Sequence, residues 1–439
     1  MRLAFSEMTR QYFSTQGVLL TLLLMTTCLS DIFADESSFT LAVVPDTQNY
    51  VDYRHQKAQG FGLDSSTLFV QQMQYLADNS VGNGGDIAFV TSVGDVWQHQ
   101  TKSIDLHHLE RGFNQEPDPI LARGAKKPKQ VLSFEMPMAT LGYQIISDAG
   151  IPFSVAPGNH DYDAAWSVKG FPPNRNKMFS ALTESVEDLG ILHVGGLDNF
   201  RTIFGEDTSF FRNKPWYVSS FKGGANSAQK FYAGGYDFLH LALEMQPGDD
   251  VLAWVESVLK DFPGLPTIIT THDFLNPAGQ RLPNPLIDLA RVDPGHHNSA
   301  EQLWNNLIKR HDQIFMVLCG HQHGQSFRVD PNDYGNPVYQ ILANYQDRGQ
   351  ATVESGRKSQ AGIGDGWLRL MHFNFGGSTP VIKVDTYSTH YNLSASETKS
   401  YAVWYKQKEQ PDMSDAEFLA ADEYVIRLAG FKQRFEAED

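Results

Sequence analysis

Short apolar runs that stop abruptly at polar side chains recur along this chain. Five such runs precede an Asp, Asn or His residue, and they span 41–44, 87–93, 151–155, 267–271 and 314–319. Runs of this length bounded by turn residues are typical of buried strands. Because open α/β sheets place their sites at the carboxyl ends of their strands, we expect these five ends to lie along one edge of a sheet.

Apolar residues at helical spacing fill the intervals between several of these strands. They predict helices over 66–77, 137–149, 251–262 and 300–310. The first two helices would connect neighbouring strands as β-α-β units, in which a helix crosses from one parallel strand to the next.

Alternating segments in the second half of the chain indicate a second sheet. Residues 231–244 surround Gly234 and Gly235 and predict a hairpin. Shorter alternating strands over 338–342, 367–373 and 381–387 are expected to complete that sheet. Two mixed β-sheets packed together, with helices outside, give an α/β fold that is a four-layer α/β/β/α sandwich.

Three segments depart from this rhythm of strands and helices. Residues 99–134 predict a long polar loop over the sheet edge, and 163–230 form an aromatic-rich insertion of the size that builds a lid or a pocket wall. The chain is therefore expected to hold one domain over 35–400 with these two insertions, followed by a C-terminal helical tail over 401–439. Ser414 and Glu417 form a capping box that predicts a helix over 414–438.

The first 34 residues differ in composition from the rest of the chain. Arg2 and Arg10 precede an apolar core over 18–25, and Ala34 offers a small residue before Asp35, which together predict a cleaved secretory signal. A membrane-spanning helix would need about 20 apolar residues, and no segment after residue 34 has that length. We expect a secreted or periplasmic protein without a transmembrane segment.

The overall composition is that of a globular protein, with 41% hydrophobic and 20% charged residues among 439. The 51 acidic and 35 basic residues give a net charge of −16, which makes nucleic acid an unfavourable partner. After signal cleavage Cys319 is the one remaining cysteine, so no intramolecular disulfide can form. Its place at the end of an apolar run predicts a buried structural thiol rather than a nucleophile.

The residues that follow the predicted strands form a set of metal-binding side chains. The set contains carboxylates, amides and imidazoles: Asp46, Gln48, Asp95, Asn159, His160, His272, His321 and His323. Such a mixture suits two divalent metal ions bridged by one carboxylate. Two ions of this kind lower the pKa of a bound water and stabilise charge on a phosphoryl group, so the set points to phosphoester hydrolysis.

The order and spacing of these residues resemble the motifs of the calcineurin-like metallophosphoesterases. That family's blocks read D-x-H, G-D, G-N-H-[DE], a histidine after a strand, and G-H-x-H, and they match stretches between Asp46 and His323. The resemblance implies the metallophosphoesterase fold and two sets of ligands: Asp46, Gln48, Asp95 and His323 for one ion, and Asp95, Asn159, His272 and His321 for the other. It also implies that His160 protonates the leaving group and that Asp161 orients His160.

Gln48 departs from the commonest form of the first block, which has histidine at that position. A neutral amide oxygen is a weaker and harder ligand than imidazole, so the ion that it helps to hold is expected to be more loosely bound. A subset of secreted family members with a P-D-T-Q start is similar. The residue types do not distinguish Mn, Zn, Fe or Ca as the two divalent ions.

The expected function is that of a secreted, dinuclear-metal-dependent phosphoesterase acting on phosphomonoesters or phosphodiesters, with a small molecule or a lipid headgroup as substrate. One alternative is a noncatalytic metal-containing binding protein on the same scaffold. Another is a sugar- or lipid-binding protein with a structural metal, although such a site would have no use for an additional His160. Asn344, Tyr345 and Arg348 follow a strand and are candidates to line the pocket. The sequence leaves open the substrate-binding residues and the oligomeric state.

Overall fold

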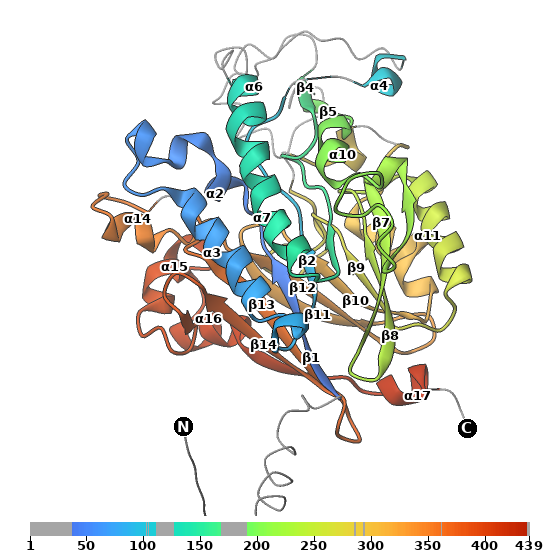
Figure 1. Cartoon of the computed structure of the whole chain (residues 1–439). Coiled ribbons are helices and arrows are strands. Elements are labelled where there is room, and N and C mark those ends of the chain that lie inside the picture. Colours follow the sequence, from blue (N-terminus) through green and yellow to red (C-terminus); the bar gives the residue numbers. More distant parts are fainter. Residues whose placement is uncertain are drawn as a thin grey trace, which may run out of the picture. The chain divides into compact units, whose positions relative to one another are not determined.

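The computed structural model describes residues 37–101, 103, 105–110, 127–167, 191–284, 287–292, 295–360 and 362–436. The signal sequence expected over 1–34 lies outside these residues. Within them most strands form two seven-stranded mixed sheets, and helices flank both sheets (Figure 1). The strands β4 (Ala164–Ser167) and β5 (Ile191–Gly195) form a separate two-stranded sheet. The expected α/β class with two mixed sheets is confirmed.

The first sheet is built around the first strand of the domain, in the order β15-β14-β13-β1-β2-β3 with β16 paired to β14. Its strands are β1 (Ser38–Val44), β2 (Ile87–Ser92), β3 (Phe153–Val155), β13 (Trp367–Asn374), β14 (Val381–Ser388), β15 (Leu393–Ser394) and β16 (Tyr424–Arg427). The expectation that β13 and β14 join the second sheet is wrong. β13 pairs antiparallel with β1 and aligns Phe39 with Phe373, whose rings stack with centroids 4.7 Å apart.

The second sheet has the order β11-β12-β10-β9-β8-β7-β6. Its strands are β6 (Tyr217–Phe221), β7 (Asn226–Ala233), β8 (Tyr236–Ala242), β9 (Thr267–Thr270), β10 (Ile314–Cys319), β11 (Gly324–Pro331) and β12 (Pro337–Asn344). The hairpin expected around Gly234 and Gly235 is confirmed as β7–β8, and both glycines have positive φ. The sheet begins earlier in the chain than expected, because β6 lies inside the segment assigned to an insertion.

Alternation along β1 divides its side chains between two apolar layers. Leu41 and Val43 pack between the two sheets, whereas Ala42 and Val44 face the helices on the outer side of the first sheet. Successive side chains of a strand point to opposite faces. The part of β1 over 41–44 is buried on both faces and therefore reads as a continuous apolar run.

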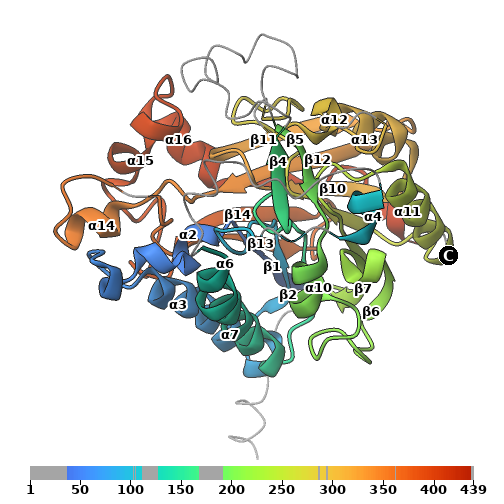
Figure 2. The same cartoon turned by 90° about the horizontal axis from the view of Figure 1, so that it is seen from above.

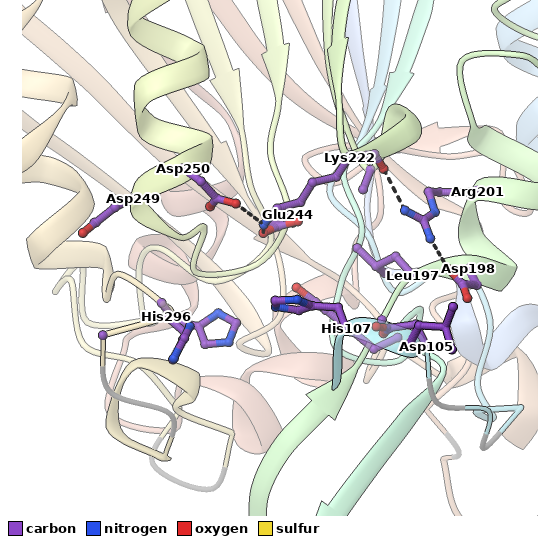
Figure 3. Close-up of a pocket in the computed structure, with 16 residues that line it drawn as sticks. Asp105, His107, Leu197, Asp198, Arg201, Lys222, Glu244, Asp249, Asp250 and His296 are labelled. Atoms are coloured by element: carbon purple, nitrogen blue, oxygen red, sulfur yellow. Dashed lines mark hydrogen bonds and ion pairs between the residues drawn. The ribbon is translucent and has the colours of Figure 1, made fainter. Parts of the chain in front are cut away.

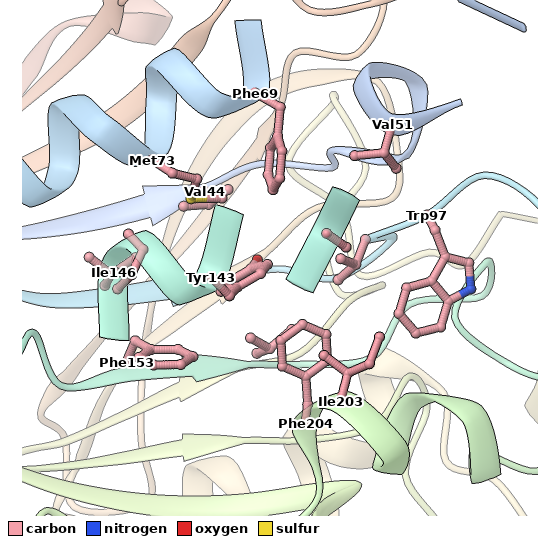
Figure 4. Packing of buried hydrophobic residues seen from close by; sticks show 14 of the residues in the cluster. Val44, Val51, Phe69, Met73, Trp97, Tyr143, Ile146, Phe153, Ile203 and Phe204 are labelled. Atoms are coloured by element: carbon pink, nitrogen blue, oxygen red, sulfur yellow. The ribbon is translucent and has the colours of Figure 1, made fainter. Parts of the chain in front are cut away.

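Two helices cover the outer face of the first sheet, namely α3 (Ser65–Asp78) and α7 (Met136–Asp148). Figure 4 shows Phe69 of α3 and Tyr143 of α7 packing in one cluster with Phe153 of β3. Gly142 of α7 permits this approach, because a Cβ there would lie 2.3 Å from the Phe69 ring. Both helices agree with the sequence prediction.

The outer face of the second sheet is covered by α11 (Asp249–Asp261) and α13 (Ala300–Asn306). Ser299 and Gln302 form a capping box that starts α13. Figure 2 shows α11 across the strands from α3 and α7. In the described residues the layers therefore run helix, sheet, sheet, helix.

The segment over 99–134 contains helices as well as loop. Its described part holds α4 (Leu106–Glu110), α6 (Lys127–Gln130) and a π-helical turn, Val131–Glu135, that leads into α7. The expectation of a loop without helices is wrong at these positions. Glu135 lies at the end of the π-helical turn and is fully buried.

The C-terminal tail is not the single helix expected over 414–438. It contains α15 (Tyr401–Glu409), α16 (Asp415–Asp422), β16 and α17 (Phe431–Phe435). The predicted capping box at Ser414 is confirmed as the start of α16. The helix ends before Tyr424–Arg427 because this stretch pairs with β14, and Val425 and Ile426 are β-branched residues that suit a strand.

Two smaller expectations concern the membrane and the thiol. In the part of the chain that the structure describes, no helix has both the length and the apolar character that a membrane crossing needs.

Cys319 is buried at the end of β10, and burial raises the pKa of its thiol. A protonated, inaccessible thiol is structural, as the sequence predicts.

We predict that His372 makes the stability of the fold depend on pH. Burial opposes the charged ring, but hydrogen bonds to Asp385 and Asp86 outweigh this and raise its pKa to about 9. Because the folded pKa exceeds the unfolded value of about 6.5, the contribution is complete below pH 6.5 and disappears as pH rises through 9. Urea unfolding of the parent and of His372→Gln should differ most below pH 6.5 and converge above 9. A difference that does not change with pH would contradict the assignment.

Candidate metal centre

The predicted ligands lie at the carboxyl ends of strands from both sheets. Asp46, Asp95 and Asn159 follow β1, β2 and β3 of the first sheet. His272 and His321 follow β9 and β10 of the second sheet. The expectation of a single sheet edge is therefore wrong, because the two sheets pack together and bring two edges to one place.

A chain of buried hydrogen bonds joins the two sheets beneath these ligands. Ser154 donates to Thr91 at 2.9 Å, Thr91 donates to Thr270 of the second sheet at 3.0 Å, and Thr270 lies 2.9 Å from Nε2 of His240. Burial lowers the pKa of His240 to about 3, so its neutral ring can accept the last hydrogen bond. The chain fixes the register of one sheet against the other.

Asp95, His272 and His321 form a compact group of buried side chains. Their potential ligand atoms lie within 4.8 Å of one another. Nε2 of His272 is 3.2 Å from Oδ1 of Asp95, and the rings of His272 and His321 have centroids 4.9 Å apart. Nδ1 of His272 donates to the carbonyl of Val93 at 2.7 Å, which leaves Nε2 directed toward the group.

The backbone at these ligands is strained and tightly packed. Asp95 and His321 have positive φ values of 52° and 65°. A Cβ on Gly158 would lie 2.3 Å from Oδ1 of Asp95, and a Cβ on Gly320 would lie 2.3 Å from Oδ1 of Asp46. Such strain persists where the surroundings enforce it, typically at functional sites.

Asn159 and His160 join this group from the first sheet. Oδ1 of Asn159 lies 3.2 Å from Nε2 of His272, and the backbone N–H of His160 donates to Oδ1 of Asp95 at 2.8 Å. Nδ1 of His160 lies 2.7 Å from the carbonyl oxygen of Gln98. This carbonyl holds the Nδ1 proton and leaves Nε2 as the atom that can exchange a proton with a substrate.

The expected role of Asp161 is wrong in detail. Its carboxylate accepts from the backbone N–H groups of Val96 and Gly158, each at 2.8 Å, while the ring of His160 is oriented by the Gln98 carbonyl. Asp161 therefore ties together the two loops that carry Asp95 and Asn159. Burial raises the pKa of Asp161 to about 8.

Asp46, Gln48 and His323 lie beside the compact group and are linked through amides. Gln48 is the first residue of a single helical turn, α2 (Gln48–Val51), and its Nε2 donates to Oδ2 of Asp95 at 3.2 Å. Asp46 accepts from the backbone N–H of His321 at 3.3 Å. The structure thus brings all the predicted ligands into one region.

Sequence reasoning missed Gln346 and Asp347. The Gln346 amide accepts from Nε2 of Gln48 and donates to Nε2 of His323, both at 2.7 Å, and Oδ2 of Asp347 lies 2.6 Å from Nδ1 of His323. Both residues follow β12, which lies parallel beside β10, so a polar run at that strand end was the available signal. Among the proposed lining residues, Asn344 bonds Asp46 at 2.8 Å.

The other two proposed lining residues have different surroundings. Tyr345 and Arg348 are buried, and Tyr345 packs in the apolar cluster beneath the C-terminal helices. The guanidinium of Arg348 stacks 4.1 Å from the centroid of the Tyr345 ring. These two side chains therefore fix the C-terminal segment and do not line a pocket.

The charges of the compact group depend on mutual pairing. Burial alone would raise the pKa of Asp95, but the neighbouring His272 and His160 outweigh it and hold that pKa well below its usual range. Burial would lower the pKa of His272, yet Asp95 and Asp46 raise it to about 10. Burial raises the pKa of Asp46 to about 7 and lowers that of His321 to about 3. Ligands must lose their protons to hold a cation, so cation binding here would release protons.

Two buried acceptors in this region test whether a cation fits. Oε1 of Gln48 and Nε2 of His321 have no hydrogen-bond partner among the described residues. An unpaired buried acceptor is costly, and a native structure requires a reason for it. Both atoms are of the kinds that bind divalent ions, so the residues present fit a metal centre.

A second group of potential ligands consists of Asp52, His99 and Glu135. Its atoms already have partners: Glu135 lies 2.7 Å from Nδ1 of His99 and accepts from its backbone N–H at 3.0 Å. Asp52 accepts two hydrogen bonds from Nε and NH2 of Arg54 at 2.9 and 2.5 Å. We interpret this group as a polar clamp between the π-helical turn and the loop after α2.

A pocket of about 730 Å³ is lined by Tyr162, two residues after His160, and by none of the predicted metal ligands. Figure 3 shows its charged residues, which include Arg201, Lys222 and Glu244. Its cationic residues are paired. Lys222 lies 2.8 Å from Glu244 and 3.3 Å from Asp250, and Arg201 pairs with Asp198. Carboxylates therefore outnumber lysine and arginine residues in the pocket, and they include Asp105 and Asp249.

The aromatic insertion contributes to this pocket differently from the expectation. The side chains of Trp166 and Phe171 lie outside the part of the chain that the structure describes. Phe210 and Phe211 are buried against Phe153, with centroids 5.8 and 5.1 Å apart, and belong to the core. The described residues of this segment that line the pocket lie around α10 (Asp198–Phe204) and α10's later neighbours in the chain, and none of them is aromatic: Gly196, Leu197, Asp198, Arg201, Lys222 and Ala225.

Comparison with known proteins gives a distant relative and no family. No family model matches the chain. Residues of the chain are 25% identical over 252 positions to the uncharacterized protein YvnB of Bacillus subtilis (strain 168). The matched stretch covers 56% of this chain and 15% of that protein's length, so the relative is a much longer protein. The chain is similar to part of it, and its printed name gives no activity.

Proposed function

We propose that this chain is a metal-dependent phosphoester hydrolase with the metallophosphoesterase fold. The observation that carries the proposal is the convergence of Asp95, His272 and His321, with a buried unpaired Nε2 on His321, at the ends of strands from two sheets. The order of the sequence motifs and the layered arrangement of the two sheets support it. Two divalent ions held there would supply the nucleophile and stabilise charge on a phosphoryl group.

The chain's own residues divide the remaining work. Asp95, Asn159, His272 and His321 would hold one ion, and Asp46, Gln48, Asp95 and His323 the other. His160 would act as general acid from Nε2, because the Gln98 carbonyl holds Nδ1. The pocket that Tyr162 helps to line would receive the leaving group of a small molecule or a lipid headgroup.

A noncatalytic metal-containing binding protein is the second candidate. Its support is the amide network around Gln48 and Gln346, which satisfies part of the first ligand set without a cation. Metal binding without hydrolysis of any phosphoester would favour this candidate over the first.

We predict that Asp95→Asn removes both metal binding and hydrolysis. Asp95 contacts His272, Gln48 and the backbone of His160, so the change affects both ligand sets. Loss of an outer partner of a ligand alone costs about 10- to 100-fold, so we expect kcat/KM on chromogenic phosphomonoesters and phosphodiesters to fall on the order of 100-fold or more. Elemental analysis should show loss of metal.

The matched control is Asp237→Asn, which removes a half-exposed carboxylate that pairs with Lys230 near the start of β8. It should keep the parent's activity and metal content. Circular dichroism should show that both variants fold. Hydrolysis at the parent's rate by a folded Asp95→Asn variant would contradict the proposal.

We predict that the effect of His160→Ala depends on the leaving group. A general acid typically contributes about 10²- to 10⁴-fold, and that contribution matters most when the departing oxygen is basic. Alkyl phosphoesters should therefore slow by roughly 100-fold or more, and activated aryl esters by only a few-fold. A plot of log kcat/KM against leaving-group pKa measures the difference, and parallel lines for parent and variant would exclude the role.

We propose that the chain is exported, either to a periplasm or to the extracellular space. The support is the charged and apolar pattern over residues 1–34. Intact mass measurement of the exported protein should give an N-terminus near Asp35. A mass that still includes Met1 would contradict cleavage.

A further inference from the structure

The C-terminal helix α15 is joined to the loop after β12 by two adjacent ion pairs. Lys408 lies 2.8 Å from Oδ1 of Asp347, and Glu409 lies 2.8 Å from the guanidinium of Arg348. Successive residues of the loop therefore pair with successive residues of the helix. Two such contacts in sequence fix the direction of the loop as well as its distance from α15.

The ion pair between Asp347 and Lys408 reaches the proposed metal centre. Oδ2 of Asp347 lies 2.6 Å from Nδ1 of His323, while its Oδ1 accepts from Nζ of Lys408 at 2.8 Å. The two oxygens of one carboxylate are thus used by a ligand on one side and a lysine on the other. A hydrogen bond at Nδ1 determines that Nε2 is the atom of His323 available to a cation.

We propose that Lys408 of the C-terminal segment is a positioning residue for the metal ligand His323, acting through Asp347. This inference rests on the proposed function and extends it to a segment that carries no metal-binding motif. Lys408 orients the carboxylate, and the carboxylate orients the ring. The C-terminal helix is in this way a part of the metal centre.

The ion pair between Arg348 and Glu409 keeps the backbone of Lys408 in place. Arg348 and Glu409 are almost completely buried, and their contact is bidentate, with a second distance of 2.9 Å. Arg348 also lies 3.2 Å from Asp422 of α16. Because the end of α15 is anchored by this buried pair, the backbone of Lys408 stays in position when its own ion pair is removed.

Stability alone gives little reason for the ion pair between Asp347 and Lys408. The Lys408 side chain is 43% exposed and that of Asp347 is 20% exposed. Ion pairs at such exposure contribute little to the free energy of unfolding. An effect of Lys408 on metal binding without a comparable effect on stability would therefore separate positioning from structural support.

The same turn of α15 offers a matched control. Lys406 lies two residues before Lys408, and its Nζ is 2.6 Å from Asp415 of α16, so it forms an ion pair that does not include Asp347. Lys406→Ala removes one charge and one ion pair from the same helix. Lys408→Arg keeps the charge and a donor at the end of the side chain.

The test is a titration of the metal-free full chain with Co²⁺, followed by calorimetry and by visible absorption. Removal of a group bonded directly to a ligand costs about 10- to 100-fold in metal affinity, and Lys408 acts one bond further out, so Lys408→Ala should weaken one of two bound ions roughly three- to tenfold. The absorption bands of that ion should shift. Lys408→Arg should restore both properties, and Lys406→Ala should match the parent.

A second variant, Asp347→Ala, tests the link directly and should weaken the same ion by about 10- to 100-fold. If the parent binds two ions and hydrolyses phosphoesters while Lys408→Ala keeps the parent's affinity and spectrum, the inference fails and the proposed function stands. Equal losses in Lys406→Ala and Lys408→Ala also overturn it. A parent that neither binds Co²⁺ nor hydrolyses phosphoesters overturns both proposals.

Discussion

The contact between Asp95 and His272 is the constraint on which the rest of the site depends. It joins the end of β2 in one sheet to the end of β9 in the other, at 3.2 Å and out of contact with water. Removing one member of a buried charged pair leaves the other uncompensated, at a cost of several kcal/mol (~3–5). The hydrogen bond from Nδ1 of His272 to the carbonyl of Val93 is a second link between the two sheets. Both sheets must therefore keep their register for the centre to exist.

The two halves of the centre satisfy their polar atoms in different ways. The side-chain NH₂ of Gln346 donates to Nε2 of His323, and its amide oxygen accepts from Nε2 of Gln48, so a hydrogen bond occupies the His323 lone pair that a cation could use. Asn344 does the same for Asp46. On the other side, Nε2 of His321 is buried without a partner among the described residues. In the amide-rich half Oε1 of Gln48 is also buried without a partner among the described residues. Because an orphaned acceptor is costly, a cation would relieve one such atom in each half.

The sequence predicts well where strands lie along the chain, but it predicts poorly which strands pair with one another. Each strand that ends at a ligand is where the apolar runs place it, because burial on both faces leaves a continuous pattern. The sheet to which β13 and β14 belong could not be read, since their alternation is the same in either sheet and the Phe39 contact is nonlocal. The family resemblance implied that Asp161 orients His160, yet the hydrogen-bond partners of Asp161 are the backbone N–H groups of Val96 and Gly158. Gln346 and Asp347 belong to no motif, and their contacts with His323 follow from the antiparallel pairing of β11 with β12, which sets Gly324 opposite Asn344.

The buried charges of the C-terminal segment make it integral to the domain. Arg369 of β13 lies 3.0 Å from Asp422 of α16, and Arg348 pairs with both Asp422 and Glu409. Two arginines are therefore buried in the main body, and their carboxylate partners come from residues 409 and 422. A buried guanidinium cannot shed its charge, because its pKa lies above 12. Without α15 and α16 both guanidinium groups would lose these carboxylate partners, and Arg348 would also lose the aromatic rings of Tyr401 and Phe418 that cover it. The segment that resembles an appendage in sequence is in physical terms the last layer of the core.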